Sequence, residues 1–421
     1  MKKYSKFYFK ILFLFLTILI FSCSENSVTN NNTNLSGKNS IFQDIKWSPE
    51  TVLFDFNELQ DLLEYNPQEN YIYLKSTNQK ARNLKKGDII VVAGKCLKKV
   101  ASVTITGNQI EVETEDALIV EAINDGRLYW DLLVDFKKLK PSSVYLEGKE
   151  DKIHLIQNDE IEFTDQWKNY EYTFKMSFKE SYANVSLTIK KKIGQNISAS
   201  FTCEGTIEKF RMTNDLVINN SEIRKMNYQN YGLKGDLTLK LVCAASGNDN
   251  ENGVELPIPI ISFPLPGLYL PVMLKMKLIL VINAVVPLEG SSQVSAKFSY
   301  NSTTGFNFDG VDASLNASMG TINIEKNIAQ TGAPGQIGAN FGIGFPRLEL
   351  SIANEILVPY IQTAFLIGGF YRTGTKPCQE AKAAFLGHVG VNLNITKDIK
   401  FKWNKELWNF EKILLQSGVC D

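Results

Sequence analysis

Histidine and cysteine are the residues of this chain whose reactivity could serve catalysis or metal binding. The 421 residues include two histidines, His154 and His388, and six cysteines. No CxxC pair occurs, and the chain contains no HExxH, GxSxG or GxxxxGKS/T motif. Histidine-based metal sites and most catalytic triads need more histidine than this. The sequence leaves enzymatic activity open but favours a non-enzymatic protein, and it predicts no catalytic residue, metal site or cofactor.

The two histidines have different surroundings. His154 lies among acidic residues between Glu150 and Glu160, and we expect it to be their solvated neighbour. His388 interrupts an apolar segment and is expected to be a core residue with its polar atoms satisfied. General acid–base catalysis needs a partner within hydrogen-bond reach in a cleft, and neither position predicts one.

Cys23 follows an apolar segment near the N-terminus. Four lysines lie before or at the edge of the segment Ile11–Phe21, and no acidic residue occurs before Glu25. A membrane-spanning helix needs about 20 apolar residues, so this segment is too short to be one. Its positive start and short apolar middle predict a secretory signal peptide over residues 1–22.

The ending Ile20-Phe21-Ser22-Cys23 resembles the lipobox of bacterial lipoproteins. In that family the cysteine thiol receives a diacylglyceryl group before the signal peptide is cleaved. The resemblance implies lipidation at Cys23 and a protein anchored in the cell envelope, at the outer membrane, either periplasmic or surface-exposed. Two or three acyl chains anchor a protein stably. The alternatives are a signal peptide with a chance cysteine and an uncleaved anchor.

The residues after Cys23 are polar and rich in asparagine. Residues 23–40 contain almost no large apolar side chain, so they cannot bury enough surface to fold. We expect them to be a flexible tether. Without the four signal-peptide lysines the chain has 41 basic and 45 acidic residues, so no basic patch is indicated and nucleic acid is not an expected partner.

Five cysteines remain besides Cys23, and export would allow disulfides among them. Cys203–Cys243 and Cys378–Cys420 are the pairings nearest in sequence, and they would leave Cys96 free. The alternative is that all five are buried thiols.

Residues 41–130 are predicted to form a small β-rich module. Ile89–Val92 reads as a short apolar strand, and two alternating segments, Leu97–Thr106 and Ile110–Thr114, flank a tight turn. The apolar residues of segment 115–123 are spaced for one or two helical turns. Acids in this module are better explained by turns and helix starts than by catalysis.

The module is similar to a segment near the start of many secreted or surface-anchored bacterial proteins. The residues that carry the similarity are Leu84, Gly87, Asp88, Ile89, Val100, Val103, Val112, Thr114, Glu115, Ala117, Glu121 and Ala122. Those proteins are uncharacterised, so the resemblance implies an exported surface protein with a β-rich body and no particular activity.

Residues 131–421 are predicted to form a β-rich body. Tyr170–Phe178 and Val185–Lys191 alternate apolar and polar side chains with a period of two, which is typical of a sheet with one solvated face. The fold class expected is mostly β, with a small N-terminal β module followed by a large antiparallel β sandwich or curved-sheet body.

A proline-rich segment divides the body. Leu256–Pro271 holds five prolines, which predicts an extended connector or an edge strand and allows a subdivision near residues 247–271. The following apolar segment, Val272–Val286, is short and contains two lysines, so we expect buried strand rather than a membrane helix.

The last strand-like segment brings several aromatic residues together, among them Trp403 and Trp408. Core packing is the first interpretation of these two residues. An exposed platform on which sugar rings stack is the alternative.

Three functions are compatible with these features. The first is a non-enzymatic, membrane-anchored surface protein that acts in adhesion, as a scaffold or in binding, with a surface protein as one possible partner. The second is a carrier that holds a lipid or another apolar ligand inside a curved sheet. The third is a glycan-binding protein that uses Trp403 and Trp408.

The lipobox generates a direct prediction. Replacing Cys23 with alanine removes the thiol that would carry the acyl chains, so the Cys23→Ala protein should leave the detergent phase in a detergent partition of cell envelopes. Retention of the variant in the detergent phase would contradict lipid anchoring at this residue.

Overall fold

The structure is a computed structural model. It describes residues 38–66, 69–136, 145–146, 154–156, 160–167, 170–193, 196–245, 249–264, 267–286, 290–331, 337–352, 358–372 and 375–420. The expected signal peptide, Cys23 and nearly all of the expected tether lie outside these residues. The described chain is mostly β, which confirms the predicted fold class.

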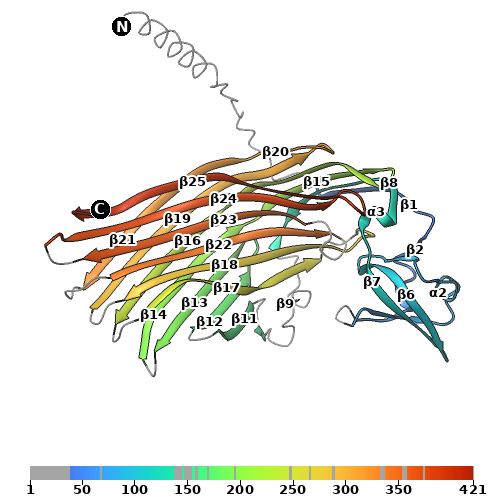
Figure 1. Ribbon diagram of the computed structural model, residues 1–421, viewed down its shortest axis with the longest axis horizontal. Coiled ribbons are helices and arrows are strands. Elements are labelled where there is room, and N and C mark those ends of the chain that lie inside the picture. Colours follow the sequence, from blue (N-terminus) through green and yellow to red (C-terminus); the bar gives the residue numbers. More distant parts are fainter. Residues whose placement is uncertain are drawn as a thin grey trace, which may run out of the picture. The chain divides into compact units, whose positions relative to one another are not determined.

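Two curved antiparallel sheets form the body (Figure 1). The strands of the larger sheet are β1 (Ser40–Trp47), β8 (Ile123–Val134), β10 (His154–Ile156), β11 (Glu160–Trp167), β12 (Tyr170–Phe178), β13 (Tyr182–Ile193), β14 (Asn196–Glu208), β15 (Phe210–Asn219), β16 (Glu222–Ala245), β19 (Gly290–Phe308), β20 (Ala313–Leu315) and β21 (Ser318–Thr331). They are arranged as β1-β8-β15-β16-β14-β13-β12-β11-β10, with β19 also paired to β16 and carrying β20 and β21.

The second sheet of the body has seven strands. These are β9 (Tyr145–Leu146), β17 (Asp249–Pro264), β18 (Val272–Val286), β22 (Ile337–Ile352), β23 (Val358–Arg372), β24 (Cys378–Asn394) and β25 (Lys400–Gly418). Their order is β25-β24-β23-β22-β18-β17-β9. The predicted strand Val272–Val286 is therefore observed as β18. The proline-rich segment contributes to β17, which pairs with β18 on one side and with only two residues of β9 on the other. Prolines, which lack a backbone N–H, are tolerated along such a sparsely paired edge.

A smaller sheet of six strands comes from residues 51–116. Its strands are β2 (Thr51–Phe54), β3 (Leu62–Asn66), β4 (Tyr71–Lys75), β5 (Ile89–Val92), β6 (Cys96–Thr106) and β7 (Gln109–Asp116), in the order β2-β5-β6-β7-β4-β3. Only the β2–β5 pair is parallel among the described pairs of this sheet. β1 and β8, which lie at the two ends of the predicted module, pair with each other in the larger sheet instead.

The helices of the described chain are single turns. They are η1 (Leu59–Asp61), α2 (Gln79–Arg82) and α3 (Ile119–Ala122), and α3 occupies the segment where one or two helical turns were expected. None of the helices among the described residues is long and apolar enough to cross a membrane.

The inner faces of the two body sheets pack against each other through aromatic rings. Side chains alternate along β12, where five residues from Tyr170 to Phe178 are buried and the residues between them are more exposed. On β19 the inward residues Phe298 and Tyr300 contact Phe365 of β23, with ring centroids 5.1 and 5.2 Å apart. Farther along the same strand, Phe308 contacts Phe401 of β25 at 4.8 Å. The period-two pattern thus buries one face of each sheet against the other.

The small sheet shares part of this core. All four residues of β5 are buried, because Ile89 and Val91 join the core of the body while Ile90 and Val92 pack into a second core inside the small sheet. An apolar strand that is buried on both faces has no solvated side, which explains why this segment lacks alternation.

A belt of polar side chains interrupts the core between the two body sheets. It consists of Asn214, Asn230, Ser302, Thr304 and Thr363, each at most 1% exposed. Both amide atoms of Asn214 lack a hydrogen-bond partner among the described residues, as do Asn230 Oδ1 and Thr304 Oγ1. A buried polar group without a partner costs about 1–3 kcal/mol. The belt is therefore the least favourable part of an otherwise apolar core.

The belt predicts a stabilising substitution. Replacing Asn214 with leucine, whose side chain has the same number of heavy atoms and the same branching, removes two unpaired polar atoms and should raise the free energy of unfolding by about 1–3 kcal/mol. Chemical denaturation followed by circular dichroism measures the change.

Asn78 provides the matched control. It is also buried, but its side chain accepts a hydrogen bond from Ala81 N–H at 3.1 Å and donates one to Asp61 at 2.9 Å. Asn78→Leu should therefore destabilise the protein by about 1 kcal/mol or more. A loss of stability in Asn214→Leu as large as that in Asn78→Leu would contradict the prediction.

Candidate functional site

An open groove lies where the small sheet meets the loops at one end of the body. We call it the junction groove; its volume is about 560 Å³. It is lined by Ser48, Pro49, Glu50, Gly87, Ile89, Lys99, Val120, Glu121, Asn124, Asn220, Ser221, Glu222, Thr396, Lys397 and Asp398. These residues belong to three parts of the chain: the small sheet with its flanking segments, the β15–β16 hairpin and the β24–β25 turn.

The β15–β16 hairpin forms one wall. Asn220 and Ser221 both have positive φ, 52° and 58°, the backbone state that a two-residue hairpin turn needs. The tip is tied down from outside, because Ser221 N–H donates to Asn124 O at 2.8 Å and Asn220 N–H donates to Asp125 Oδ1 at 3.0 Å. This wall is therefore held to the start of β8 by one backbone bond and one bond to a side chain.

The β24–β25 turn forms the second wall. Thr396 Oγ1 accepts hydrogen bonds from the N–H groups of Asp398 and Ile399, at 3.2 and 3.1 Å, and these close the turn. Ile223 N–H donates to Ile395 O at 3.1 Å, which joins this turn to the first wall. Lys397 and Asp398 are consequently presented at the rim of the groove.

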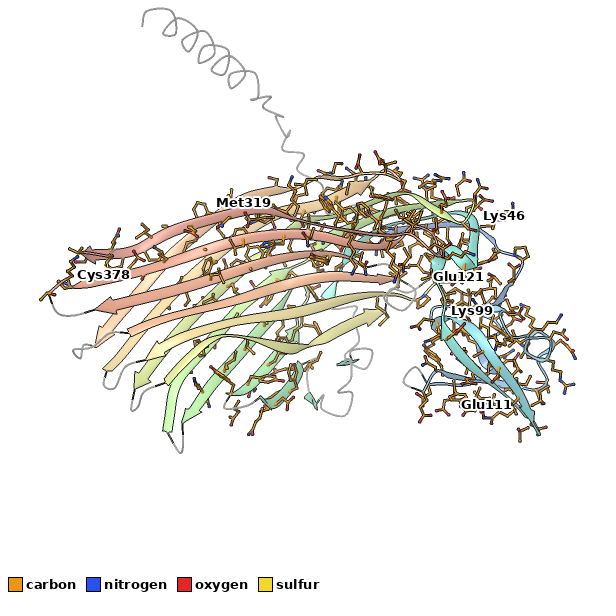
Figure 2. The ribbon with its side chains drawn as sticks, viewed as in Figure 1. Lys46, Lys99, Glu111, Glu121, Met319 and Cys378 are labelled. Atoms are coloured by element: carbon orange, nitrogen blue, oxygen red, sulfur yellow. A yellow bond between two sulfur atoms is a disulfide. The ribbon has the colours of Figure 1, made fainter. Side chains whose placement is uncertain are left out.

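The third wall belongs to the small sheet and α3. Ser48 N–H donates to Ala122 O at 2.9 Å, and Ser48 Oγ donates to Glu121 O. The Glu121 carboxylate accepts a hydrogen bond from Leu118 N–H at 2.8 Å and lies 3.4 Å from Lys99 Nζ (Figure 2). Glu121 therefore caps α3 and pairs with a lysine, as the capping interpretation of acids in this module implies.

The chemistry of the junction groove is polar and mixed in charge. It contains four carboxylates, those of Glu50, Glu121, Glu222 and Asp398, and two lysines. Its lining includes no histidine or cysteine, and the described residues contain no group of three or more His, Cys, Asp or Glu side chains that could hold a metal ion. These groups can donate and accept hydrogen bonds to a ligand, but they do not form a nucleophile–base pair.

Asp125 anchors the hairpin electrostatically. The backbone N–H of Asn220 bonds to its carboxylate and, together with Lys46 and Asn124, holds the pKa of Asp125 below its ordinary value despite some desolvation. On the outer face of β8 and β15, Asp215 is bound by Arg127 at 2.7 Å and Lys225 at 2.8 Å. Burial raises the pKa of Asp215, but these two cations outweigh it and the net shift is downward.

A second open depression lies on the outer face of the larger sheet, and we call it the sheet hollow. It has a volume of about 430 Å³ and is lined by Glu160, Lys175, Ser177, Asn184, Val185, Ser186, Glu204, Gly205 and Thr206. All of these residues lie on the consecutive strands β11 to β14. The sheet hollow is therefore a feature of one sheet face, separate from the junction groove.

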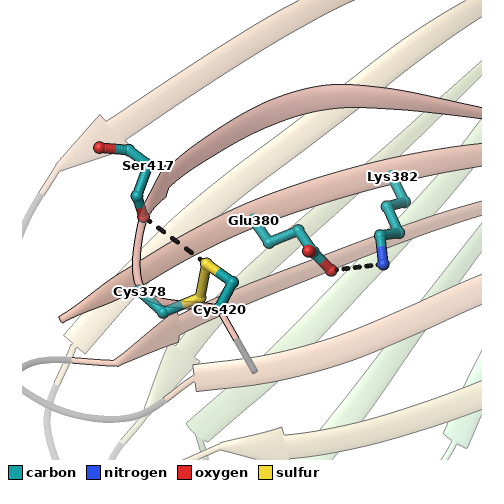
Figure 3. Close-up of a disulfide and its surroundings, with 5 residues drawn as sticks. All are labelled: Cys378, Glu380, Lys382, Ser417 and Cys420. Carbon is teal, nitrogen blue, oxygen red and sulfur yellow. Dashed lines mark hydrogen bonds and ion pairs between the residues drawn. A yellow bond between two sulfur atoms is a disulfide. The ribbon is translucent and has the colours of Figure 1, made fainter. Parts of the chain in front are cut away.

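The cysteine predictions have different outcomes. Cys378 and Cys420 form a disulfide that ties the C-terminal end of the chain to the start of β24 (Figure 3). The Cys203–Cys243 pairing was wrong, because Cys203 is a buried free thiol and the strand register places Cys243 opposite Ala199 rather than Cys203. Cys96 is free and buried as expected, and burial raises its pKa to about 12. Neither thiol is poised as a nucleophile.

Trp403 and Trp408 are both partly buried and pack against the main core. The Trp403 ring lies 6.1 Å from Phe306 and the Trp408 ring lies 5.6 Å from Phe385, measured between centroids. Gly387 makes room for Trp408, since a Cβ atom there would overlap the indole. These contacts are those of core residues, and the glycan-stacking role of the two rings stays a prediction.

His388 does not occupy the core position that its apolar neighbours suggested. Its side chain is 39% exposed, and Nε2 lies 3.9 Å from the carboxylate of Glu406 on β25. Phe385, Val389 and Val391 are the buried residues around it, so period-two alternation along β24 places His388 on the opposite face. His154 belongs to β10, and its side chain lies outside the described part of the structure.

Sequence reasoning missed the junction groove. Its signals were present as turn-forming residues, Asn219-Asn220-Ser221 and Thr396-Lys397-Asp398, each between two strands. The sequence did not reveal that these two turns and α3 lie next to one another, because their proximity depends on the order of the strands in the sheets.

The Asp125 contacts predict a pH dependence. A carboxylate whose pKa is lowered on folding contributes stability above its unfolded pKa, near 4, and the contribution disappears as the pH falls through the folded value. Asp125→Asn should therefore lower stability at pH 7 and lose this deficit as the pH is brought below about 4. Denaturation midpoints of the two proteins between pH 2.5 and 7 measure this, with exposed Asp398→Asn as the control. A deficit that does not depend on pH would contradict the prediction.

No family model matches this chain, and neither a curated protein nor a solved structure matches it. The junction groove is therefore interpreted from its own geometry.

Proposed function

We propose that this protein is an exported lipoprotein, anchored through Cys23, that works as a non-enzymatic binding protein and contacts its partner through the junction groove. The lipobox-like sequence supports the anchor, and the polar residues after Cys23 provide a tether between the membrane and the β body. The location that follows is the cell envelope, at the outer membrane.

The composition of the junction groove carries the binding part of the proposal. The groove is open, it joins three separate segments of the chain, and its charged side chains are of both signs. The Ser48 hydroxyl and the Glu121 carboxylate are the kinds of group that can act as a nucleophile and a base, but both form structural hydrogen bonds in the groove. Such a surface fits recognition by hydrogen bonds and ion pairs better than bond cleavage.

A carrier of an apolar ligand is the second candidate. The curvature of the two body sheets and the apolar inner face of β12 favour it. Against it stand the direct ring contacts between β19 and strands β23 and β25, which fill the space between the sheets there. Apart from Val272 and Met273, the side chains of β18, the other strand expected to line such a cavity, lie outside the described residues.

Photo-cross-linking in intact cells tests the groove. A photoreactive amino acid at Ser221, on the groove wall, should give a discrete cross-linked product. The same amino acid at Thr104, exposed on β6 of the small sheet and away from the groove lining, should give none.

Three outcomes decide the test. A product from Ser221 alone supports the proposal. Equal labelling from both positions, or labelling from neither, would contradict a binding role for the groove. Cross-linking of Ser221 to a bound lipid rather than to a protein or glycan would favour the carrier instead.

A further inference from the structure

The outer face of the larger sheet presents polar side chains in rows that run across the strands. Backbone pairing aligns Glu160, Ser177, Asn184 and Thr206 in one row, and Glu162, Lys175, Ser186 and Glu204 in the next. A third row consists of threonines only: Thr164, Thr173, Thr188 and Thr202. Neighbouring strands are about 4.8 Å apart, so each row is a closely spaced series of hydrogen-bonding groups.

The sheet hollow lies in the first two rows. Small side chains, those of Ser177, Ser186 and Thr206, form much of its lining. Asn184 donates a hydrogen bond to Ser177 Oγ at 3.2 Å, so the amide of Asn184 is oriented while its carbonyl oxygen remains available to a ligand. Tyr182 occupies the same face of β13 two residues before Asn184 and adds an aromatic ring beside the depression.

The charges of the sheet hollow disfavour anionic ligands. Lys175 is its only cation, and Lys175 Nζ is bound to Glu162 at 2.8 Å. Glu160 and Glu204 outnumber this lysine, so an anionic ligand such as a phosphate or a sulfated sugar would meet net negative charge. The one apolar residue of the lining, Val185, has its side chain buried in the main core, so the hollow offers no apolar surface for a lipid tail.

We propose that the sheet hollow is a binding site for an uncharged saccharide. Sugar hydroxyl groups act as both donors and acceptors, and they match the hydroxyl, amide and carboxylate groups of Ser177, Asn184, Ser186, Thr206 and Glu204. Tyr182 supplies an apolar ring face beside them. The site is independent of the junction groove and of Trp403 and Trp408.

A binding assay on the full-length mature protein in detergent micelles tests the site. The probes are neutral tetrasaccharides of glucose, mannose, galactose and N-acetylglucosamine, with a sulfated and a sialylated oligosaccharide as anionic comparisons. Titration calorimetry should show binding of at least one neutral probe and weaker or no binding of the anionic ones.

Two substitutions test whether the saccharide binds in the sheet hollow. Ser186→Gln inserts a larger side chain into the hollow and should weaken binding at least tenfold. Thr188→Gln, two residues farther along the same face of β13 and outside the lining, should leave the dissociation constant within about twofold. Circular dichroism checks that both variants keep the β spectrum of the parent.

Asn184→Ala provides a second disruption that adds no bulk and should also weaken binding. Absence of binding to every neutral probe, a preference for the anionic probes, or equal binding by the parent and Ser186→Gln proteins would each overturn the proposal. The cross-linking test at Ser221 is unaffected by these outcomes, so the two sites stand or fall separately.

Discussion

The packing of two apolar sheet faces against each other is the constraint on which the other features depend. Side chains alternate along a strand, so the contacts of Phe298 and Tyr300 with Phe365 determine which residues of β19 point outward. The backbone pairing of β19 with β16, of β16 with β14 and of β14 with β13 then sets the outward residues of those strands. The polar rows of the outer face follow from this choice. The same packing directs the hairpins at the end of the sheets toward the small sheet, where the junction groove forms.

Local patterns in the sequence were sufficient for much of the fold. The alternation of β12 and the four apolar residues of β5 were readable because each pattern lies within one strand. Features set by pairing between distant strands were not readable. Cys203 and Cys243 are consecutive cysteines in the sequence, yet the β14–β16 register pairs Cys203 with Leu239, four residues before Cys243. His388 has apolar neighbours, yet it lies on the face of β24 opposite the buried Phe385 and Val389, and its pairing partner on β25 is Glu406.

The acids of the small sheet illustrate how a recurring sequence pattern can reflect structure rather than catalysis. Asp88 accepts a hydrogen bond from Lys85 N–H at 2.8 Å and closes a turn, and Glu121 caps α3 while pairing with Lys99. Both are among the residues on which the resemblance to exported surface proteins was based. The carboxylates secure the turn and the helix that shape one wall of the junction groove, so the pattern describes a scaffold and not the ligand that the scaffold serves.

The glycine beneath Trp408 has a consequence for the end of the smaller body sheet. β25 pairs only with β24 among the described strands, so one of its edges has no ladder to hold its alignment. The indole of Trp408 fits over Gly387, and no adjacent position of β24 offers the same vacancy, because Leu386 and His388 both carry large side chains. The fit of Trp408 over Gly387 opposes a shift of β25 by one residue along β24. It acts in the middle of the strand, whereas the Cys378–Cys420 disulfide acts at the end of the strand. The ring contact and the disulfide together hold the register of β25, which is bonded to a neighbouring strand along only one of its edges.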